Sequence, residues 1–307
     1  MALIINDFIA KYGIASLCVK LGENILQSSY SDYLFYRLGT KKVIDLELEA
    51  TRQCITKSGL SSSDIDLIIS SSTATEFLAP GNASIIQKEI EATNAMALSI
   101  EAHCASFIVS ISLAESLGIR YGFNNVLIVL SSTYSKIIGV QADKYNYSDA
   151  AGAILLSAGT KSKIIVDTKI CSYGSLYDKK VVTKNSGSSE HMMKNISAYD
   201  SIDLKLVSAK QIPNIGFALL RANELSVENI SAIFFHQSPS LSTWIDNSLK
   251  TVKIIPDLFS EYGNLGMVNI PFLIDYYSVC STIKPTDIVL CLSPGIGWHA
   301  AGMVLRW

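Results

Sequence analysis

Charged side chains are scarce in this chain of 307 residues. Lys, Arg, Asp and Glu together make up 17% of the sequence, and the formal net charge is -2. Proteins that hold nucleic acid or an anionic membrane surface by electrostatics carry a basic patch or an excess of positive charge. We therefore expect neither nucleic acid nor a membrane as a partner. A small-molecule or protein-carried substrate is expected instead.

Apolar runs that could span a membrane are also missing. The longest stretches, 104–117 and 126–130, are broken by Ser and Glu or fall short of the roughly 20 residues of a transmembrane helix. The first residues lack the basic segment, the sustained apolar run and the cleavage site of a secretory signal. These features predict a cytoplasmic protein.

The cysteines form no Cys-x-x-Cys pair. The chain has six of them, scattered at Cys18, Cys54, Cys104, Cys171, Cys280 and Cys291. Neither a zinc site nor a disulfide framework is suggested by this spacing. We expect free thiols, one of them reactive, and no bound metal.

An internal repeat is the main feature that the sequence does contain. Residues 60–71 resemble residues 225–236, because in each a turn with acidic or amide side chains leads into a short apolar run. Residues 125–131 and 287–293 resemble each other in the same way. The apolar runs predict buried strands. The same order of elements therefore occurs twice along the chain.

Helical patterns precede the later strand of each repeat, at 105–121 and 267–283. Helices that alternate with buried strands predict an α/β protein with helices on the faces of the sheets. With 49% hydrophobic residues and a mean hydropathy of +0.31, the chain can bury a large core. We predict two duplicated halves, 1–160 and 161–307. The polar stretch 178–200 is predicted to be a surface loop over the site.

Cys104 lies between a predicted strand at 95–100 and the first of these helices. A thiol at the N-terminus of a helix is close to the positive end of the helix dipole, which favours the thiolate. A strand-to-helix turn can also hold a nucleophile exposed beside backbone N–H groups. The alternative is a small buried side chain, the commoner role of a lone cysteine.

Two further residues could act with this thiol. His236 ends a predicted strand, where it could serve as a general acid or base or as a structural histidine. Asn264 stands in a glycine-flanked turn, where a helix N-cap is the simplest interpretation. The repeat places Asn264 opposite Cys104 and makes His236 the counterpart of Ser71. We therefore predict one site from all three.

A glycine turn follows the last predicted strand, in Leu292-Ser-Pro-Gly-Ile-Gly. It could be a tight connection, or it could bring a backbone N–H to an oxyanion. Because Pro294 has no N–H, Gly295 is the nearest candidate donor.

These motifs resemble those of the β-ketoacyl-acyl-carrier-protein synthase III group of the thiolase superfamily, over nearly the whole chain. His-Cys104-Ala-Ser-Phe is similar to the Ala-Cys-Ser-Gly-Phe of that group. His236-Gln-Ser-Pro is similar to its His-Gln-Ala-Asn, and Gly-Asn264-Leu-Gly-Met to its Gly-Asn-Thr-Ser-Ala. The turn at Gly295 is closer to the Gly-Pro-Gly-Leu of type III polyketide synthases.

The resemblance implies a thiolase fold in a five-layered αβαβα arrangement and an acyltransferase of the ketosynthase type. Cys104 would take an acyl group from an acyl-CoA or acyl-carrier-protein thioester. Its own backbone N–H and that of Gly295 would bind the oxyanion. His236 and Asn264 would polarise a malonyl or β-ketoacyl thioester for decarboxylative condensation. Coenzyme A and phosphopantetheine thioesters would be substrates, with no resident cofactor.

The resemblance also implies a homodimer and a coenzyme A site. Tyr33 and Arg37 stand where the group has an aromatic residue and an arginine that contact the nucleotide, although an ordinary surface helix would contain the same types. Phe77 would reach the acyl pocket of the neighbouring subunit, or would be a core side chain.

Departures from the family pattern bear on the role of the protein. His103, Ser106 and Pro239 replace a small residue, a glycine and an asparagine of the family motifs. These changes favour secondary metabolism, with a polyketide or fatty-acid-derived product, over the acetyl-primed role. Two alternatives stay open. One is transfer of the acyl group to an alcohol or amine, and the other is a non-catalytic partner in a heterodimer.

Overall fold

The computed structural model describes residues 12–27, 32–139, 141–177, 181–184, 191–194, 201–238 and 249–307. Nine strands form one sheet in the order β11-β12-β13-β8-β1-β7-β6-β4-β5. In chain order they are β1 Tyr12–Leu21, β4 Leu67–Ser72, β5 Met96–Ser99, β6 Asn125–Ser132, β7 Ala150–Ala158, β8 Ile164–Ser172, β11 Ile230–Phe235, β12 Ile288–Gly295 and β13 His299–Arg306.

A narrow junction divides this sheet into two parts. β1 and β8 are joined by one register pair, Gly13 with Ile164, and by a hydrogen bond of 3.1 Å from the Ile14 N–H to the Lys163 carbonyl oxygen. One part therefore consists of β1, β7, β6, β4 and β5, and the other of β8, β13, β12 and β11.

The pairing of strands repeats in the two parts. β4 runs parallel to β6, and β6 runs antiparallel to β7. In the same way β11 runs parallel to β12, and β12 runs antiparallel to β13. The duplicated α/β architecture predicted from the sequence is confirmed.

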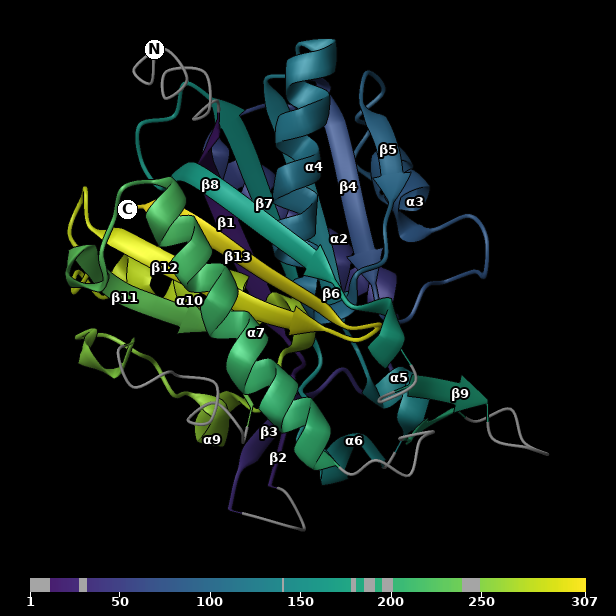
Figure 1. Ribbon diagram of the computed structural model, residues 1–307. Coiled ribbons are helices and arrows are strands. Elements are labelled where there is room, and N and C mark those ends of the chain that lie inside the picture. The colour runs from purple at the N-terminus through teal and green to yellow at the C-terminus, as the bar shows by residue number, and fades with distance from the viewer. Residues whose placement is uncertain are drawn as a thin grey trace.

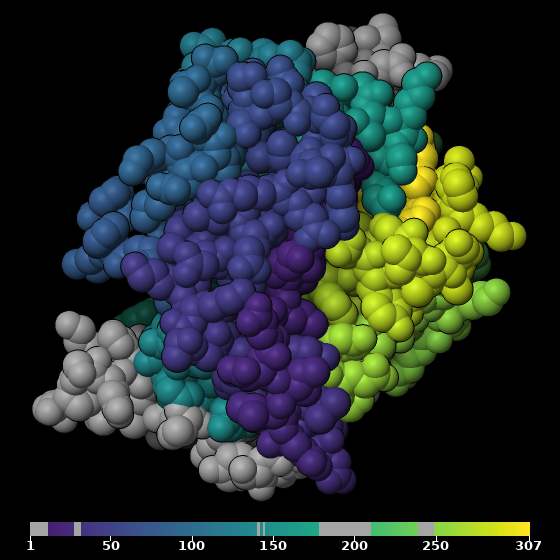
Figure 2. Space-filling view, turned by 180° about the vertical axis from the view of Figure 1, so that it is seen from behind, coloured from purple at the N-terminus to yellow at the C-terminus, as the bar shows by residue number. Residues whose placement is uncertain are grey.

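Helices form three layers around the two parts of the sheet. The long helices are α2 Val43–Ser58, α3 Asn82–Glu89, α4 Ser106–Tyr121, α7 Ser201–Ala222 and α10 Asn269–Val279. α2 and α3 cover the outer face of the first part, and α7 covers β12 and β13 of the second (Figure 1). α4 and α10 pack against strands of both parts, which gives the predicted order αβαβα. Figure 2 shows the opposite face, where purple and blue residues of the first part border green and yellow residues of the second.

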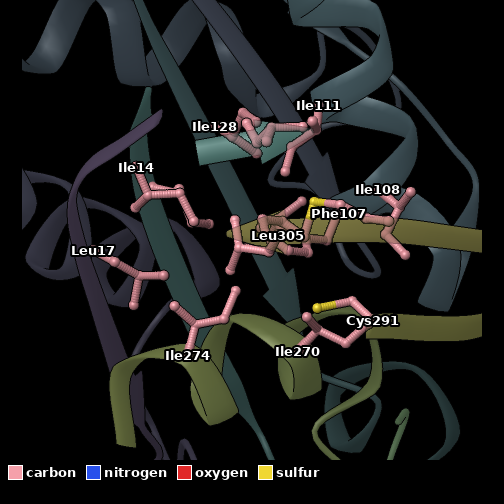
Figure 3. Close-up of a cluster of buried hydrophobic side chains, with 14 of the residues drawn as sticks. Ile14, Leu17, Phe107, Ile108, Ile111, Ile128, Ile270, Ile274, Cys291 and Leu305 are labelled. Carbon is pink, nitrogen blue, oxygen red and sulfur yellow. The ribbon is translucent and has the colours of Figure 1, made fainter. Parts of the chain in front are cut away.

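The central layer holds the largest apolar core. Figure 3 shows that its side chains come from β1, β6, β12 and β13 as well as from α4 and α10. Phe107 of α4 and Ile270 of α10 are 1% and 3% exposed, respectively. Burial of such side chains fixes the N-terminal ends of α4 and α10 in the middle of the molecule, and these are the ends that follow Cys104 and Asn264.

The remaining elements are short. Two hairpins are formed by β2 Asn24–Gln27 with β3 Leu34–Arg37 and by β9 Val181–Lys184 with β10 His191–Lys194. The short helices are α5 Ser135–Ile138, α6 Gln141–Lys144 and α9 Phe259–Tyr262, and the 3₁₀ turns are η1 Ser62–Asp64, η2 His103–Ala105, η3 Gly174–Leu176, η4 Val227–Asn229, η5 Leu249–Thr251 and η6 Gly266–Val268. Within the described ranges, no helix has the length and apolar character needed to cross a bilayer.

The stretch 178–200, predicted to be a surface loop, contains a paired hairpin within its described part. β9 and β10 pair there in register, Val181 with Lys194 and Lys184 with His191. The stretch as a whole is rich in Lys, Ser and Asn, but β9 itself is Val-Val-Thr-Lys, and Val and Thr favour strands.

Candidate functional site

Cys104 lies in the turn η2, directly before α4, as the sequence predicted. The residue is 8% exposed, and His103 before it has a φ of 46°. Ser106 holds this turn. Its Oγ accepts hydrogen bonds from the Ala102 N–H at 3.2 Å and from the Ser71 hydroxyl at 2.8 Å. The serine that departs from the family motif therefore ties the cysteine turn to the end of β4.

The end of β12 supports the same turn from the other side. The Ser293 hydroxyl donates to the Cys104 carbonyl oxygen at 2.8 Å. A Cβ added to Gly295 would lie 2.6 Å from the Ala102 carbonyl oxygen and 3.0 Å from the Ala105 Cβ. Gly295 is thus closely packed on the cysteine turn. That its N–H binds an oxyanion stays a prediction.

His236 directly follows β11 and is 4% exposed. Its backbone N–H donates to the Leu292 carbonyl oxygen at 3.1 Å, which continues the pairing of β11 with β12. The ring Nδ1 lies 3.2 Å from the Gly266 carbonyl oxygen and 3.1 Å from Nδ2 of Asn269. One edge of the imidazole is therefore anchored to the segment that begins α10.

Asn264 is 7% exposed and follows Gly263, whose φ of 68° suits glycine. Its Oδ1 accepts from the Gly266 N–H at 2.8 Å and from Nδ2 of Asn269 at 3.2 Å. Because Oδ1 is the end that accepts both bonds, Nδ2 is the end with which Asn264 would bind a substrate oxygen.

The three predicted residues come from distant stretches of the chain, and their segments meet at η6. The turn η2, which carries Cys104, packs against η6 and against β12. Nδ1 of His236 lies 3.2 Å from the carbonyl oxygen of Gly266, the first residue of η6, and Oδ1 of Asn264 accepts from the N–H of the same residue. A buried thiol, an imidazole and a carboxamide around one turn can perform acyl transfer through a covalent thioester. Their catalytic roles stay predictions.

Two tyrosines near the cysteine were missed by the sequence analysis. The rings of Tyr134 and Tyr147 are stacked, with centroids 4.1 Å apart, and both are buried. Burial raises the pKa of each phenol well above its usual value, and the charge of Cys104 adds to both shifts. They are neutral aromatic neighbours of the thiol. Tyr and Phe occur throughout the sequence, so nothing in it distinguished these two.

His103 is hydrogen-bonded to Glu101. Its Nε2 lies 2.9 Å from Oε1 of Glu101, and the two side chains are 28% and 74% exposed. The hydrogen bond with His103 lowers the pKa of Glu101. The histidine that departs from the family motif is therefore held at the surface beside the cysteine turn.

The residues predicted for the coenzyme A and substrate site differ in their contacts and exposure. Tyr33 packs edge-to-face on Phe259, with ring centroids 5.2 Å apart. Arg37 is 9% exposed. Its guanidinium donates to the carboxylate of Asp143 and to the backbone carbonyl oxygens of Tyr36 and Tyr147. Phe77 is 58% exposed. Their roles stay predictions, and Pro239 lies outside the described residues. No cluster of three potential metal ligands occurs in the described part of the chain.

Comparison with protein families gives two separate matches. Residues 98–174 match the model of 3-oxoacyl-[acyl-carrier-protein (ACP)] synthase III, and residues 220–307 match the model of its C-terminal domain. The first match contains Cys104, and the second contains His236 and Asn264.

Individual relatives agree with these matches. The chain is 30% identical over 272 residues to a beta-ketoacyl-[acyl-carrier-protein] synthase III of Clostridium perfringens, covering 84% of this chain and 83% of that protein. It is 27% identical over 310 residues to the protein of the same name from Porphyra umbilicalis, covering 93% of each.

Solved structures share the fold. A 3-oxoacyl-(acyl carrier protein) synthase III of Pseudomonas aeruginosa superposes with a TM-score of 0.85 at 17% identity, over 97% of this chain and 98% of that one. A variant of OleA from Xanthomonas campestris superposes with a TM-score of 0.84 at 16% identity, over 97% of this chain and 99% of that one. The thiolase fold expected from the sequence is confirmed.

Proposed function

The chain belongs to the 3-oxoacyl-[acyl-carrier-protein] synthase III family, and from this premise we propose that it is a condensing acyltransferase with Cys104 as its nucleophile. The first half, 1–160, would supply the cysteine, and the second half, 161–307, would supply His236 and Asn264. The substrates would be acyl and malonyl, or β-ketoacyl, thioesters of coenzyme A or an acyl carrier protein.

In the first step, the Cys104 thiol loses its proton and its thiolate attacks the carbonyl carbon of the acyl thioester. The bond to the donor sulfur breaks, the donor leaves as a thiolate that takes up the proton lost by Cys104, and the acyl group stays on Sγ. The tetrahedral oxyanion is stabilised by the backbone N–H of Cys104 and by that of Gly295. The close packing of Gly295 on the cysteine turn supports this assignment.

In the second step, a malonyl thioester loses carbon dioxide. His236 and Asn264 donate hydrogen bonds to its thioester oxygen, on which the electron pair of the broken carbon–carbon bond accumulates. The resulting enolate attacks the acyl carbonyl carbon and releases the thiolate of Cys104. Two neutral donors suit this charge, because they stabilise an enolate without protonating its carbon.

One observation carries the proposal: Nδ1 of His236 and Oδ1 of Asn264 both lie within 3.2 Å of backbone atoms of Gly266, in a turn that packs on the turn of Cys104. A second hydrogen-bond donor to the malonyl thioester oxygen would assist decarboxylation. Transfer of the acyl group to an alcohol or amine does not require it. The arrangement therefore favours condensation.

The departures at His103 and Ser106 support a specialised substrate and, with it, a role in secondary metabolism. We also propose a cytoplasmic homodimer. Phe77 and Leu78 are 58% and 105% exposed, and their loop leads into α3, which packs on the edge strand β5, so they offer an apolar surface for a second copy.

Acyl loading tests the nucleophile. The protein is incubated with a panel of acyl-CoA donors, and its intact mass is measured. We expect one acyl adduct, its absence in Cys104→Ala, and its retention in Cys280→Ala, which removes an exposed thiol elsewhere. An adduct that persists in Cys104→Ala, or no adduct with any donor, contradicts the assignment.

Addition of malonyl-CoA or malonyl-carrier protein to the acylated enzyme tests the acceptor. We expect carbon dioxide and a β-ketoacyl product, identified by mass spectrometry. If the acyl group leaves Cys104 for an alcohol or amine without decarboxylation, the transferase alternative is correct. If loading is absent altogether, the non-catalytic partner is favoured.

A further inference from the structure

The buried side chain of Asn269 connects the two groups that would bind the malonyl oxygen. Asn269 is the first residue of α10 and is 1% exposed. Its Nδ2 lies 3.1 Å from Nδ1 of His236, 3.2 Å from Oδ1 of Asn264 and 3.0 Å from the Gly266 carbonyl oxygen. The amide nitrogen of Asn269 therefore contacts both His236 and Asn264.

The orientation of this amide follows from its surroundings. The backbone N–H of Leu265 donates to Oδ1 of Asn269 at 3.3 Å. Because a backbone N–H donates to it, the amide atom near Leu265 is the oxygen. The nitrogen, with its two protons, therefore faces His236 and Asn264. Asn269 is therefore a donor toward both groups.

The group that forms a hydrogen bond with Nδ1 sets the tautomer of the imidazole. In a neutral ring one nitrogen carries the proton and the other accepts. Nδ1 faces the Asn269 nitrogen at 3.1 Å and the Gly266 carbonyl oxygen at 3.2 Å, and that carbonyl is also within reach of Asn269 at 3.0 Å. If Nδ1 accepts from Asn269, the proton is on Nε2, the nitrogen on the other edge of the ring.

The same contact orients Asn264. With Oδ1 held by the Gly266 N–H and by Asn269, the amide of Asn264 cannot rotate without losing two hydrogen bonds. Its Nδ2 then remains a donor. The substrate oxygen would consequently meet two N–H groups, one from each side chain.

We propose that Asn269 is a positioning residue that holds His236 as the Nε2–H tautomer and Asn264 with its amide nitrogen toward the substrate. Its role in decarboxylation rests on the proposed function, whereas its effect on the imidazole does not. The family motif alone did not indicate it, because at the start of a helix an asparagine reads as an ordinary capping residue.

The tautomer can be measured without a substrate. The protein is labelled with ¹⁵N in its four histidines, and a His236→Gln variant identifies the signals of that ring. We expect the Nε2–H form in the unaltered protein. In Asn269→Asp the carboxylate accepts a proton from Nδ1, so we expect the Nδ1–H form or the imidazolium. An Nδ1–H ring in the unaltered protein overturns the proposal even if no variant folds.

The half-reactions supply the second measurement. For Asn269→Ala we expect acylation of Cys104 to stay within about threefold, while decarboxylation of a malonyl thioester by the acyl-enzyme falls roughly 10- to 100-fold, the scale of a misplaced reacting group. Asn82→Ala is the control, because Asn82 is also 1% exposed but binds Glu47 on another face. That variant should slow neither half-reaction selectively.

The half-reaction rates distinguish a failure of the positioning role of Asn269 from a failure of the proposed function. Equal losses in both half-reactions for Asn269→Ala, or the same selective loss in Asn82→Ala, contradict the positioning role. If the unaltered protein never decarboxylates a malonyl thioester, the proposed function fails. The nitrogen signals of His236 then still decide what Asn269 does.

Discussion

The Ser293 hydroxyl donates a hydrogen bond of 2.8 Å to the backbone carbonyl oxygen of Cys104. The two residues are 189 positions apart and belong to different halves of the chain. Ser293 is 1% exposed, so its hydroxyl acts in a setting shielded from water. A side chain of the second half thus fixes the backbone of the predicted nucleophile in the first.

Ser293→Ala removes this bond and leaves a buried carbonyl oxygen without it. We expect the free energy of unfolding to fall by about 1–3 kcal/mol, the usual cost of such a group. Acyl loading of Cys104 should also slow, because the turn that presents the thiol is less constrained. Urea unfolding and intact-mass time courses measure the two effects. Ser157→Ala is the control, because it removes a hydroxyl that binds Asn125 away from the site. If acyl loading slows more in this control than in Ser293→Ala, the explanation is wrong.

Gly295→Ala tests the contact between β12 and the cysteine turn. The new Cβ would lie 2.6 Å from the Ala102 carbonyl oxygen, which is backbone and cannot rotate away, so the turn must shift. We expect acyl loading to fall at least 10-fold, because displacement of a nucleophile by a fraction of an ångström is costly. The measurement is the initial rate of adduct formation.

Gly174→Ala is the matched control for that change, because a Cβ at Gly174 would meet nothing within 4 Å. Unaltered loading in Gly295→Ala would show that this glycine is not needed to position the turn. A comparable loss in Gly174→Ala would show that the assay responds to general destabilisation.

The sequence was most informative where local pattern and chemistry coincide. β11 and β12 were predicted because their apolar runs are continuous, and His236 was predicted because it stands where such a run ends. Cys104 and Asn264 were found because each precedes a repeated helix. Repetition of the order of elements predicted the layers, since each half has to cover the faces of its own strands.

The supporting contacts could not be predicted in this way. Ser293, Ser106 and Asn269 act through hydrogen bonds to backbone or side chains that only the tertiary fold brings near. Ser, Asn and Tyr also occur at many exposed positions, so their residue type carries no signal by itself. The hairpin of β9 and β10 was missed for a different reason, because each strand has only four residues, too few to show the alternation that identifies strands with one buried face.

Self-association should depend on the apolar loop between β4 and α3. Leu78 is 105% exposed and lies in that loop, which leads into α3, the helix that packs on the edge strand β5. We expect Leu78→Asp to shift the protein from dimer toward monomer, because the charge would be desolvated in the interface. Sedimentation velocity over a range of concentrations measures the shift.

Val279→Asp is the control for the dimer, since Val279 is an exposed apolar residue, 81% accessible, at the end of α10. It should leave the sedimentation profile unchanged. A monomeric unaltered protein, or equal dissociation by both variants, would place the contact elsewhere.

Stability should fall as the pH rises, because of a carboxyl group in the central layer. Glu115 lies on α4, and its Oε1 has no hydrogen-bond partner among the residues that the structure describes. Burial raises the pKa of Glu115 from 4.5 to about 8, and the charge of Asp167 adds to the shift. The folded state thus binds this proton more tightly than the unfolded chain does. Its contribution is complete below pH 4.5 and is lost as the pH rises through about 8.

Glu115→Gln removes this titration. We expect the variant and the unaltered protein to have similar free energies of unfolding near the acid end of the range. At the alkaline end the variant should be more stable by on the order of 1–3 kcal/mol, after allowance for the part of the side chain that water reaches. Urea unfolding across the range gives the difference, and Glu89→Gln, on the exposed end of α3, should show no such trend. Parallel curves for Glu115→Gln and the unaltered protein would mean that Glu115 is ionised in the folded state without penalty.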